Sequence, residues 1–328
     1  MQCFLALVAL SLISWAAAAP HPVRTDPDFS QLQWFARLAS LAYCMRPWHE
    51  QTFMNTTHCP AEACSDAAFD TLQVNHVFDF LGFLEVGLGF IAVDHQEQTL
   101  FLVYKGTGSA RDWVKNLNAF PVRYEPVVHS NPNFSPALGF DCEGCYIHKG
   151  FGTFTRTNGA TILKKVQECI SDYPDYRLVV AGHSLGGAMA LMSAIELRLL
   201  GHDVLAVTLG APRVGNSKFA LFADKLFDTR AAAAHIDQNR SFTALRTALV
   251  RMVHRHDVVP MLPPGYKHSG YEYFLGEAGV NQTRELVTRG GLDYNTEAKY
   301  DFGRRFPTEY STTDHVGYFY RVSTCKSS

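Results

Sequence analysis

Ser184 stands in a setting that favours nucleophilic chemistry. It is the centre of Gly182-His183-Ser184-Leu185-Gly186, which follows the apolar run 177–181 and opens the helix-like segment 185–200. A serine on a tight strand-to-helix turn exposes its hydroxyl at the sheet edge, and glycines two residues away let neighbouring backbone pass closely. The helix N-terminus then offers N–H groups to a developing oxyanion. We predict that Ser184 is a nucleophile and interpret His183 as structural, because adjacent side chains on this turn point apart.

A seryl nucleophile needs a histidine base, and the base needs a carboxylate. Where this serine turn occurs, the chain order is Ser, Asp, His. Asp257 fits, because it follows the strand-like run 247–254 and precedes an apolar, proline-rich turn. The remaining candidates are interpreted as solvated helix residues or as part of a surface insertion at 229–240: Asp224, Asp228 and Asp237.

Two histidines follow Asp257 and could act as the base. His315 lies on a loop before a final apolar segment, which leaves enough chain to return to the sheet edge. His268 comes soon after Asp257, and it is the alternative, either as the base or as a site-lining or structural residue. We predict His315 as the general base.

Ser184, Asp257 and His315 can meet only if the predicted strands form a sheet whose edge brings them together. Apolar runs typical of strands alternate with amphipathic segments typical of helices. The strand candidates are 89–94, 99–104, 177–181, 203–209 and 247–254, and the helix candidates are 151–172, 185–200, 217–227 and a segment that begins near Asp28. Residues 106–146 are irregular and repeatedly broken by proline. The pattern predicts an α/β fold with a mostly parallel central sheet flanked by helices, as a single domain over 19–328.

The N-terminus and the composition bear on compartment and partners. Residues 1–18 resemble a secretory signal peptide, with an apolar run ending in small residues, although a basic residue before that run is missing. A membrane anchor is the alternative, but the run is short and lacks a basic flank. No later stretch is long and apolar enough to span a bilayer. A net charge of −2 gives no basic field for nucleic acid. We predict a secreted, extracellular protein.

Cysteines and glycosylation triplets fit an oxidising compartment. Seven cysteines remain after the signal peptide, which implies three bridges and one free thiol: Cys44, Cys59, Cys64, Cys142, Cys145, Cys169 and Cys325. Four Asn-X-Ser/Thr triplets are candidate glycosylation sites: Asn55, Asn133, Asn239 and Asn281. Neither His-Glu-X-X-His nor a cysteine-pair zinc spacing occurs, and we predict neither a metal nor a cofactor.

Seven short motifs occur in a fixed order along nearly the whole chain after the predicted signal peptide. They are Tyr104-Lys-Gly-Thr-Gly-Ser109, Ile147-His-Lys-Gly-Phe151, Tyr173-Pro-Asp-Tyr176, Gly182-His-Ser-Leu-Gly-Gly187, Gly210-Ala-Pro-Arg-Val-Gly215, Asp257-Val-Val-Pro260 and Asp314-His315. Together they resemble the secreted fungal and yeast lipases of class 3, a family that also holds feruloyl esterases. The resemblance implies the α/β-hydrolase fold and the triad Ser184, Asp257 and His315.

The same resemblance implies further site residues. The oxyanion hole would be the backbone N–H groups of Thr107 and Leu185, with the Thr107 hydroxyl assisting. Lys105 departs from the family's usual arginine, which leaves the hole unaffected. The implied bridges are Cys44–Cys325, Cys59–Cys64 and Cys142–Cys145, which leaves Cys169 as the buried free thiol.

The segment after Thr107 bears on the substrate. Its apolar residues fall at i, i+3, i+4 and i+7: Ala110, Trp113, Val114 and Leu117. This short amphipathic helix resembles the lid of the family's lipases, which would cover the serine in water and turn outward at an oil surface. An ordinary surface helix packed on the core is the alternative.

We therefore predict a triacylglycerol lipase-like enzyme that hydrolyses acylglycerol esters through an acyl-enzyme at an oil–water interface. Alternatives on the same scaffold are a feruloyl or other soluble-ester carboxylesterase, a phospholipase, and a non-catalytic lipid-binding protein. The oligomeric state does not follow from the sequence.

Overall fold

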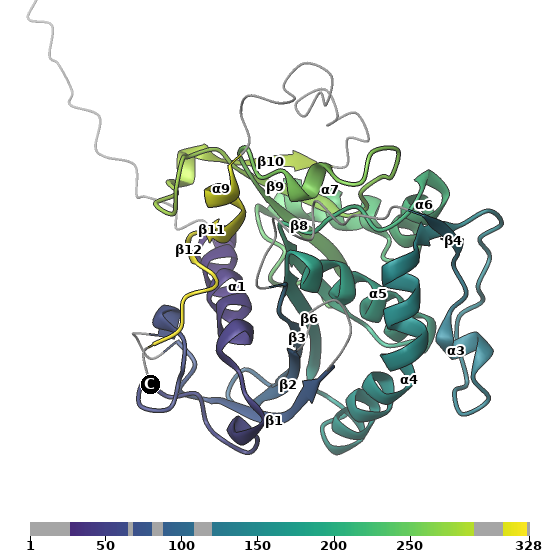
Figure 1. Ribbon diagram of the computed structural model, residues 1–328, viewed down its shortest axis with the longest axis horizontal. Coiled ribbons are helices and arrows are strands. Elements are labelled where there is room, and N and C mark those ends of the chain that lie inside the picture. Colours follow the sequence, from purple (N-terminus) through teal and green to yellow (C-terminus); the bar gives the residue numbers. More distant parts are fainter. Residues whose placement is uncertain (1–26, 65–67, 81–87, 108–119, 292–310, 327–328) are drawn as a thin grey trace, which may run out of the picture.

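The computed structural model describes residues 27–64, 68–80, 88–107, 120–291 and 311–326. Within these residues, eight strands form one sheet in the order β1-β2-β3-β6-β7-β8-β9-β10 (Figure 1). The strands are β1 (Leu72–Asp79), β2 (Leu88–Asp94), β3 (Thr99–Tyr104), β6 (Arg177–His183), β7 (Leu205–Leu209), β8 (Ala248–His254), β9 (Tyr271–Leu275) and β10 (Val287–Gly291). The strands from β3 to β9 run parallel, and the outer strands pair antiparallel.

Helices cover both faces of this sheet (Figure 1). One face carries α1 (Pro27–Cys44) and α7 (Thr229–Asn239), and the other carries α4 (Lys149–Asp172), α5 (Leu185–Leu199) and α6 (Ser217–Leu226). The shorter elements are η1 (Pro47–His49), η2 (Glu62–Cys64), β4 (Pro121–Arg123), α3 (Val127–Ser130), β5 (Tyr146–His148), η3 (Val259–Met261), η4 (Arg284–Leu286), α9 (Thr312–Val316), β11 (Gly317–Tyr318) and β12 (Tyr320–Arg321).

The core explains why the strands are apolar almost throughout. In β3, Phe101 and Val103 pack on the side of α1, whereas Leu100 and Leu102 pack on the side of α5. A parallel sheet with both faces covered buries successive residues, so its strands lose the alternation seen at a half-exposed sheet. The predicted α/β class, with a mostly parallel sheet between helices, is confirmed.

Two predictions about the region after Ser217 were wrong. Residues 229–240 were expected as a surface insertion, but they form α7, whose Ala232, Ala233 and Ile236 join the core. Small alanine side chains allow close packing, which a count of large apolar residues does not reveal. Asp224 was expected to be solvated, but it is buried and its carboxylate accepts the backbone N–H of Gly270 at 2.8 Å.

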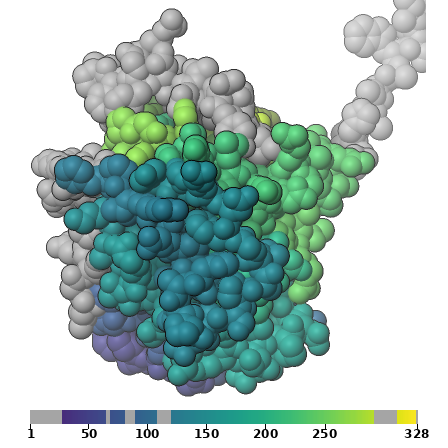
Figure 2. Space-filling view, turned by 90° about the vertical axis from the view of Figure 1, so that its right-hand side faces the viewer, coloured from purple at the N-terminus to yellow at the C-terminus, as the bar shows by residue number. Residues whose placement is uncertain are grey.

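A buried carboxylate holds the described part of the irregular segment 106–146 against the core. Glu196 of α5 accepts the hydroxyl of Tyr124 at 2.9 Å and the N–H groups of Val127 and Val128, both at 3.1 Å. Burial raises the pKa of Glu196 to about 7. The side of the molecule with α3 and α4 faces the viewer in Figure 2, where teal segments from the middle of the chain cover it.

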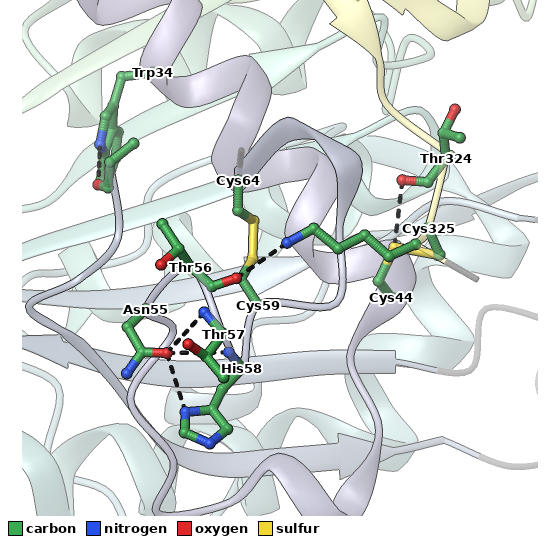
Figure 3. The surroundings of a disulfide bond; sticks show 12 residues. Trp34, Cys44, Asn55, Thr56, Thr57, His58, Cys59, Cys64, Thr324 and Cys325 are labelled. Carbon is green, nitrogen blue, oxygen red and sulfur yellow. Dashed lines mark hydrogen bonds between the residues drawn. A yellow bond between two sulfur atoms is a disulfide. The ribbon is translucent and has the colours of Figure 1, made fainter. Parts of the chain in front are cut away.

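The three expected disulfides are present in the structure. Cys44–Cys325 ties the end of α1 to the C-terminal segment, and Cys59–Cys64 closes a short loop beside it (Figure 3). Cys142–Cys145 closes a turn before β5, and the thiol of Cys169 is buried and free. Three of the glycosylation candidates are exposed and one is half-buried: Asn133, Asn239, Asn281 and Asn55, respectively.

Among the described residues, helices with the length and hydropathy needed to cross a bilayer are absent. The predicted signal peptide lies outside the described residues.

Candidate active site

Ser184 sits on the turn between β6 and α5 in a conformation that non-glycine residues seldom adopt, with φ 58° and ψ −130°. The surrounding glycines are required by packing. A Cβ on Gly182 would lie 2.3 Å from the carbonyl oxygen of Gly186, and a Cβ on Gly186 would lie 2.5 Å from the oxygens of Tyr104 and Lys105. The Gly-X-Ser-X-Gly spacing therefore lets the strand, the turn and the helix meet closely enough to hold the strained serine.

The structure brings Ser184, His315 and Asp257 together above the sheet edge. Nε2 of His315 lies 2.8 Å from Oγ of Ser184, and Nδ1 of His315 lies 2.9 Å from both carboxylate oxygens of Asp257. Each of the three side chains is at least 98% buried. Because Nδ1 donates to the carboxylate, Nε2 of the neutral ring is free to accept the serine proton.

Asp257 is held by two further donors. The N–H of Val259 lies 2.9 Å from Oδ1, and the hydroxyl of Tyr318 lies 2.7 Å from Oδ2. The Tyr318 oxygen in turn accepts the N–H of His254 at 3.1 Å. Sequence reasoning missed Tyr318. Its only signal was an aromatic residue three positions after His315, and sequence spacing alone does not show that its hydroxyl points back toward Asp257.

The alternative candidates are engaged elsewhere. Nε2 of His268 donates to the carbonyl oxygen of Pro260 at 2.7 Å, and burial holds the pKa of His268 well below its usual value. The carboxylate of Asp224 faces Gly270, Asp228 is exposed, and Asp237 accepts the hydroxyl of Tyr271.

His183 lies beside the triad, although it precedes the serine on a turn where neighbouring side chains diverge. Its ring centroid is 4.8 Å from that of His315, and its Nε2 lies 2.7 Å from the carbonyl oxygen of His315. Its Nδ1 lies 2.7 Å from the hydroxyl of Tyr43. Burial, reinforced by the nearby His315, lowers the pKa of His183 well below its usual value.

The two residues expected at an oxyanion hole lie at the same edge of the sheet. Leu185 begins α5, where backbone N–H groups have no acceptor within the helix. Thr107 is buried, and its Oγ1 has no hydrogen-bond partner among the described residues. A Cβ on the preceding Gly106 would lie 2.7 Å from the Cβ of Ser184, so this segment passes directly against Ser184.

The predicted lid is not tested by the described residues. The lid positions Ala110, Trp113, Val114 and Leu117 lie outside them. Within the described part of the chain, groups of three or more His, Cys, Asp or Glu residues that could hold a metal ion are absent.

Comparisons with known proteins point to one family. The model of the family "Lipase (class 3)" matches residues 101–267. The protein LIH1 of Saccharomyces cerevisiae is 31% identical over 286 residues, which cover 84% of this chain and 86% of LIH1. The secreted mono- and diacylglycerol lipase 2 of Gibberella zeae is 30% identical over 297 residues, which cover 84% of this chain and 68% of that protein.

A solved structure extends the match to three dimensions. The nonglycosylated LIP2 lipase of Yarrowia lipolytica superposes with a TM-score of 0.73 at 28% identity, and the match covers 91% of this chain and 96% of that chain. The chain therefore belongs to the class 3 lipase family and is a carboxylic ester hydrolase with the α/β-hydrolase fold, similar to triacylglycerol lipases.

Proposed function

We propose that this protein is a secreted enzyme that hydrolyses acylglycerol esters through a covalent acyl-enzyme. The observation that carries the proposal is the unbroken line of hydrogen bonds from Ser184 through His315 to Asp257. His315 takes the hydroxyl proton as the serine oxygen bonds to the ester carbonyl carbon, and it returns that proton to the departing alcohol. Water then cleaves the acyl-enzyme by the same route.

The backbone N–H groups of Thr107 and Leu185 are proposed to stabilise the oxyanion of each tetrahedral intermediate. The unpaired Thr107 hydroxyl supports this assignment, because burying a donor without a partner costs free energy that an incoming oxyanion would recover. Gly106, the residue before Thr107, supports it because a Cβ there would lie 2.7 Å from the Cβ of Ser184.

Glycerides are the proposed substrates, with mono- and diacylglycerols included alongside triacylglycerols. The relatives from Gibberella zeae and Penicillium cyclopium carry the name secreted mono- and diacylglycerol lipase, at 30% and 26% identity. The amphipathic pattern at 109–117 supports a lid that opens at an oil–water interface. The apolar leader 1–18 and three disulfides support secretion.

A rate curve across the solubility limit of the substrate tests the substrate class. We expect a rise in rate when tributyrin, a diacylglycerol or a monoacylglycerol passes from monomers to an emulsion. Equal rates below and above that limit, with methyl ferulate as the best substrate, would instead indicate a soluble-ester esterase. Preference for phosphatidylcholine vesicles over every glyceride would indicate a phospholipase.

The Ser184→Ala variant tests the mechanism. We expect its kcat to fall by about 10⁴-fold or more while its circular dichroism spectrum is retained, because the acyl-enzyme can no longer form. A serine-directed phosphonate should label the wild-type protein at Ser184 and should not label the variant. Full turnover by the variant would refute the proposal, and a wild-type protein that is neither active nor labelled would be a lipid-binding protein.

A further inference from the structure

Tyr43 and His183 connect two parts of the active site that the triad leaves unconnected. Tyr43, near the end of α1, lies 2.7 Å from Nδ1 of His183 through its hydroxyl. Nε2 of His183 lies 2.7 Å from the backbone carbonyl oxygen of His315. Gly106, the residue before Thr107, packs directly against the same hydroxyl, since a Cβ on Gly106 would lie 2.5 Å from the Tyr43 oxygen. One close packing contact and two hydrogen bonds thus connect Gly106 and Thr107, the proposed oxyanion segment, to the backbone of His315.

The chemistry of the groups determines which atom donates and which accepts in each of these hydrogen bonds. Nε2 of His183 faces a carbonyl oxygen, which can only accept, so Nε2 carries the proton. The pKa of His183 lies well below its usual value, so the ring is neutral and Nδ1 is an acceptor. Burial raises the pKa of Tyr43, which keeps the phenol protonated and able to donate to Nδ1.

We propose that Tyr43 and His183 are positioning residues for ester hydrolysis, which set the oxyanion segment and the general base at a fixed distance from each other. The inference rests on the proposed function of Ser184. Catalysis by differential binding requires the oxyanion donors and the base to be correctly placed at the same moment. At one end of this network the Tyr43 hydroxyl packs against Gly106, directly before Thr107, and at the other end His183 binds the carbonyl oxygen of His315.

Tyr43, at one end of this hydrogen-bond network, is itself held in place by the surrounding structure. Cys44, the residue after Tyr43, is disulfide-bonded to Cys325 in the C-terminal segment (Figure 3). The guanidinium of Arg46 donates to the carbonyl oxygen of Tyr43 at 3.3 Å. Helix α1 also packs on the core cluster that contains the inner residues of β3 and β6. A phenol held in this way can restrain His183 without following its movements.

Kinetics on a soluble short-chain ester test the proposal, because they avoid interfacial binding. We expect Tyr43→Phe to lower kcat about tenfold and His183→Phe about 100-fold, with KM changed less than about twofold, because the loss falls on the transition state. His183→Gln, whose amide can still donate to the His315 carbonyl, should recover part of the kcat lost in His183→Phe.

The double variant Tyr43→Phe with His183→Phe separates a connected chain from two independent contacts. If the two residues act through each other, the double variant loses less activity than the product of the two single losses. Losses that multiply would overturn the connected chain. A kcat within about twofold of wild type in both single variants would overturn the positioning role altogether.

Tyr124→Phe is the matched control, because it also removes a buried hydroxyl, one that binds Glu196 away from the triad. It should lower the melting temperature and leave kcat unchanged. Ser184→Ala, measured in parallel, distinguishes the two levels of inference. An inactive Ser184→Ala with active Tyr43 and His183 variants would leave the proposed function standing and remove only the positioning chain.

Discussion

At the scale of single residues, the site is defined by how completely its polar atoms are paired. Both ring nitrogens of His315 have partners, and both oxygens of Asp257 have two. In a buried setting each unpaired donor or acceptor would cost about 1–3 kcal/mol, so the ring has little freedom to rotate away. The exception is the Thr107 hydroxyl, which lacks a partner among the described residues. Ser184, His315 and Asp257 are therefore held in place by their own hydrogen bonds.

Tyr318 gives a prediction at this scale. In addition to His315, two donors bind the Asp257 carboxylate. Tyr318→Phe removes one of them and keeps the aromatic ring of residue 318 and its packing. We expect kcat to fall about threefold to tenfold, as for the net loss of one hydrogen bond, with KM unchanged. Steady-state kinetics on a soluble ester measure both constants. Wild-type kcat in this variant would show that Val259 and His315 suffice to orient the carboxylate.

At the scale of elements, the decisive unit is strand β6, the serine turn and helix α5. The strand places Ser184 at the sheet edge, and the first turn of α5 supplies the N–H of Leu185. The close approach of β6, the turn and β3 leaves room only for glycine at positions 182 and 186. The two glycines of the motif are therefore required by backbone packing.

Gly182→Ala tests that requirement. Its methyl group would lie 2.3 Å from the Gly186 oxygen, which is backbone and cannot move aside without shifting α5. We expect the free energy of unfolding to fall by about 3 kcal/mol or more, with loss of activity. Gly139→Ala is the control, because a Cβ there meets nothing within 4 Å. Urea unfolding curves compare the two, and equal stability would contradict the packing argument.

The contact of α5 with α3 has its own pH dependence through Glu196. Its pKa is raised to about 7 by burial, so the folded state binds this proton more tightly than the unfolded chain does. The resulting stability is present below the unfolded pKa near 4.5 and is lost as pH rises through about 7. Between pH 5 and pH 8 this one group should lower the free energy of unfolding by roughly 2–3 kcal/mol.

Glu196→Gln should remove that part of the pH dependence, because the amide does not titrate. The measurement is urea unfolding at pH 5 and pH 8, in which the variant should lose less stability than wild type. Glu168→Gln is the matched control, since this exposed carboxylate pairs with Lys165 and its pKa is lowered, outside the tested range. Equal pH dependence in wild type and Glu196→Gln would contradict the prediction.

At the scale of the whole molecule, the two ends of the described chain close on each other. The ring of Phe29 in α1 packs edge-on against Phe319, and Arg37 donates to the hydroxyl of Tyr320 at 2.8 Å. The Cys44–Cys325 disulfide makes this closure covalent. Because His315 and Tyr318 lie just before this segment, the same closure that completes the core also positions the proposed base.

The disulfides should therefore differ in their contribution to stability. Cys44–Cys325 spans 281 residues and Cys59–Cys64 spans 5, so the first restricts the unfolded chain far more. We expect Cys44→Ala with Cys325→Ala to lower stability by roughly 3–5 kcal/mol and Cys59→Ala with Cys64→Ala by roughly 2 kcal/mol. Calorimetric melting of the two double variants measures the order, and the reverse order would contradict the entropic argument.

Much of the architecture followed from local patterns. Apolar runs bounded by turns predicted β3, β6, β7 and β8, and the helical periodicity of 151–172 predicted α4, because burial of one face of a helix imposes that spacing. Helix α7 was not predicted from the sequence because its buried face is made mainly of alanine. Asp224 was misplaced because its partner is a backbone N–H from a loop 46 residues away, which no local pattern encodes.

The sequence by itself indicated the family and singled out candidates for the nucleophile, the acid and the base. A serine between spaced glycines after an apolar strand is a local signal, since the turn is built from consecutive residues. Only the tertiary structure decided that His315, rather than His268, reaches Ser184, and that Tyr318, Tyr43 and His183 hold the surrounding backbone. Those contacts join segments up to 140 residues apart, and their geometry depends on how the sheet and its helices close in space.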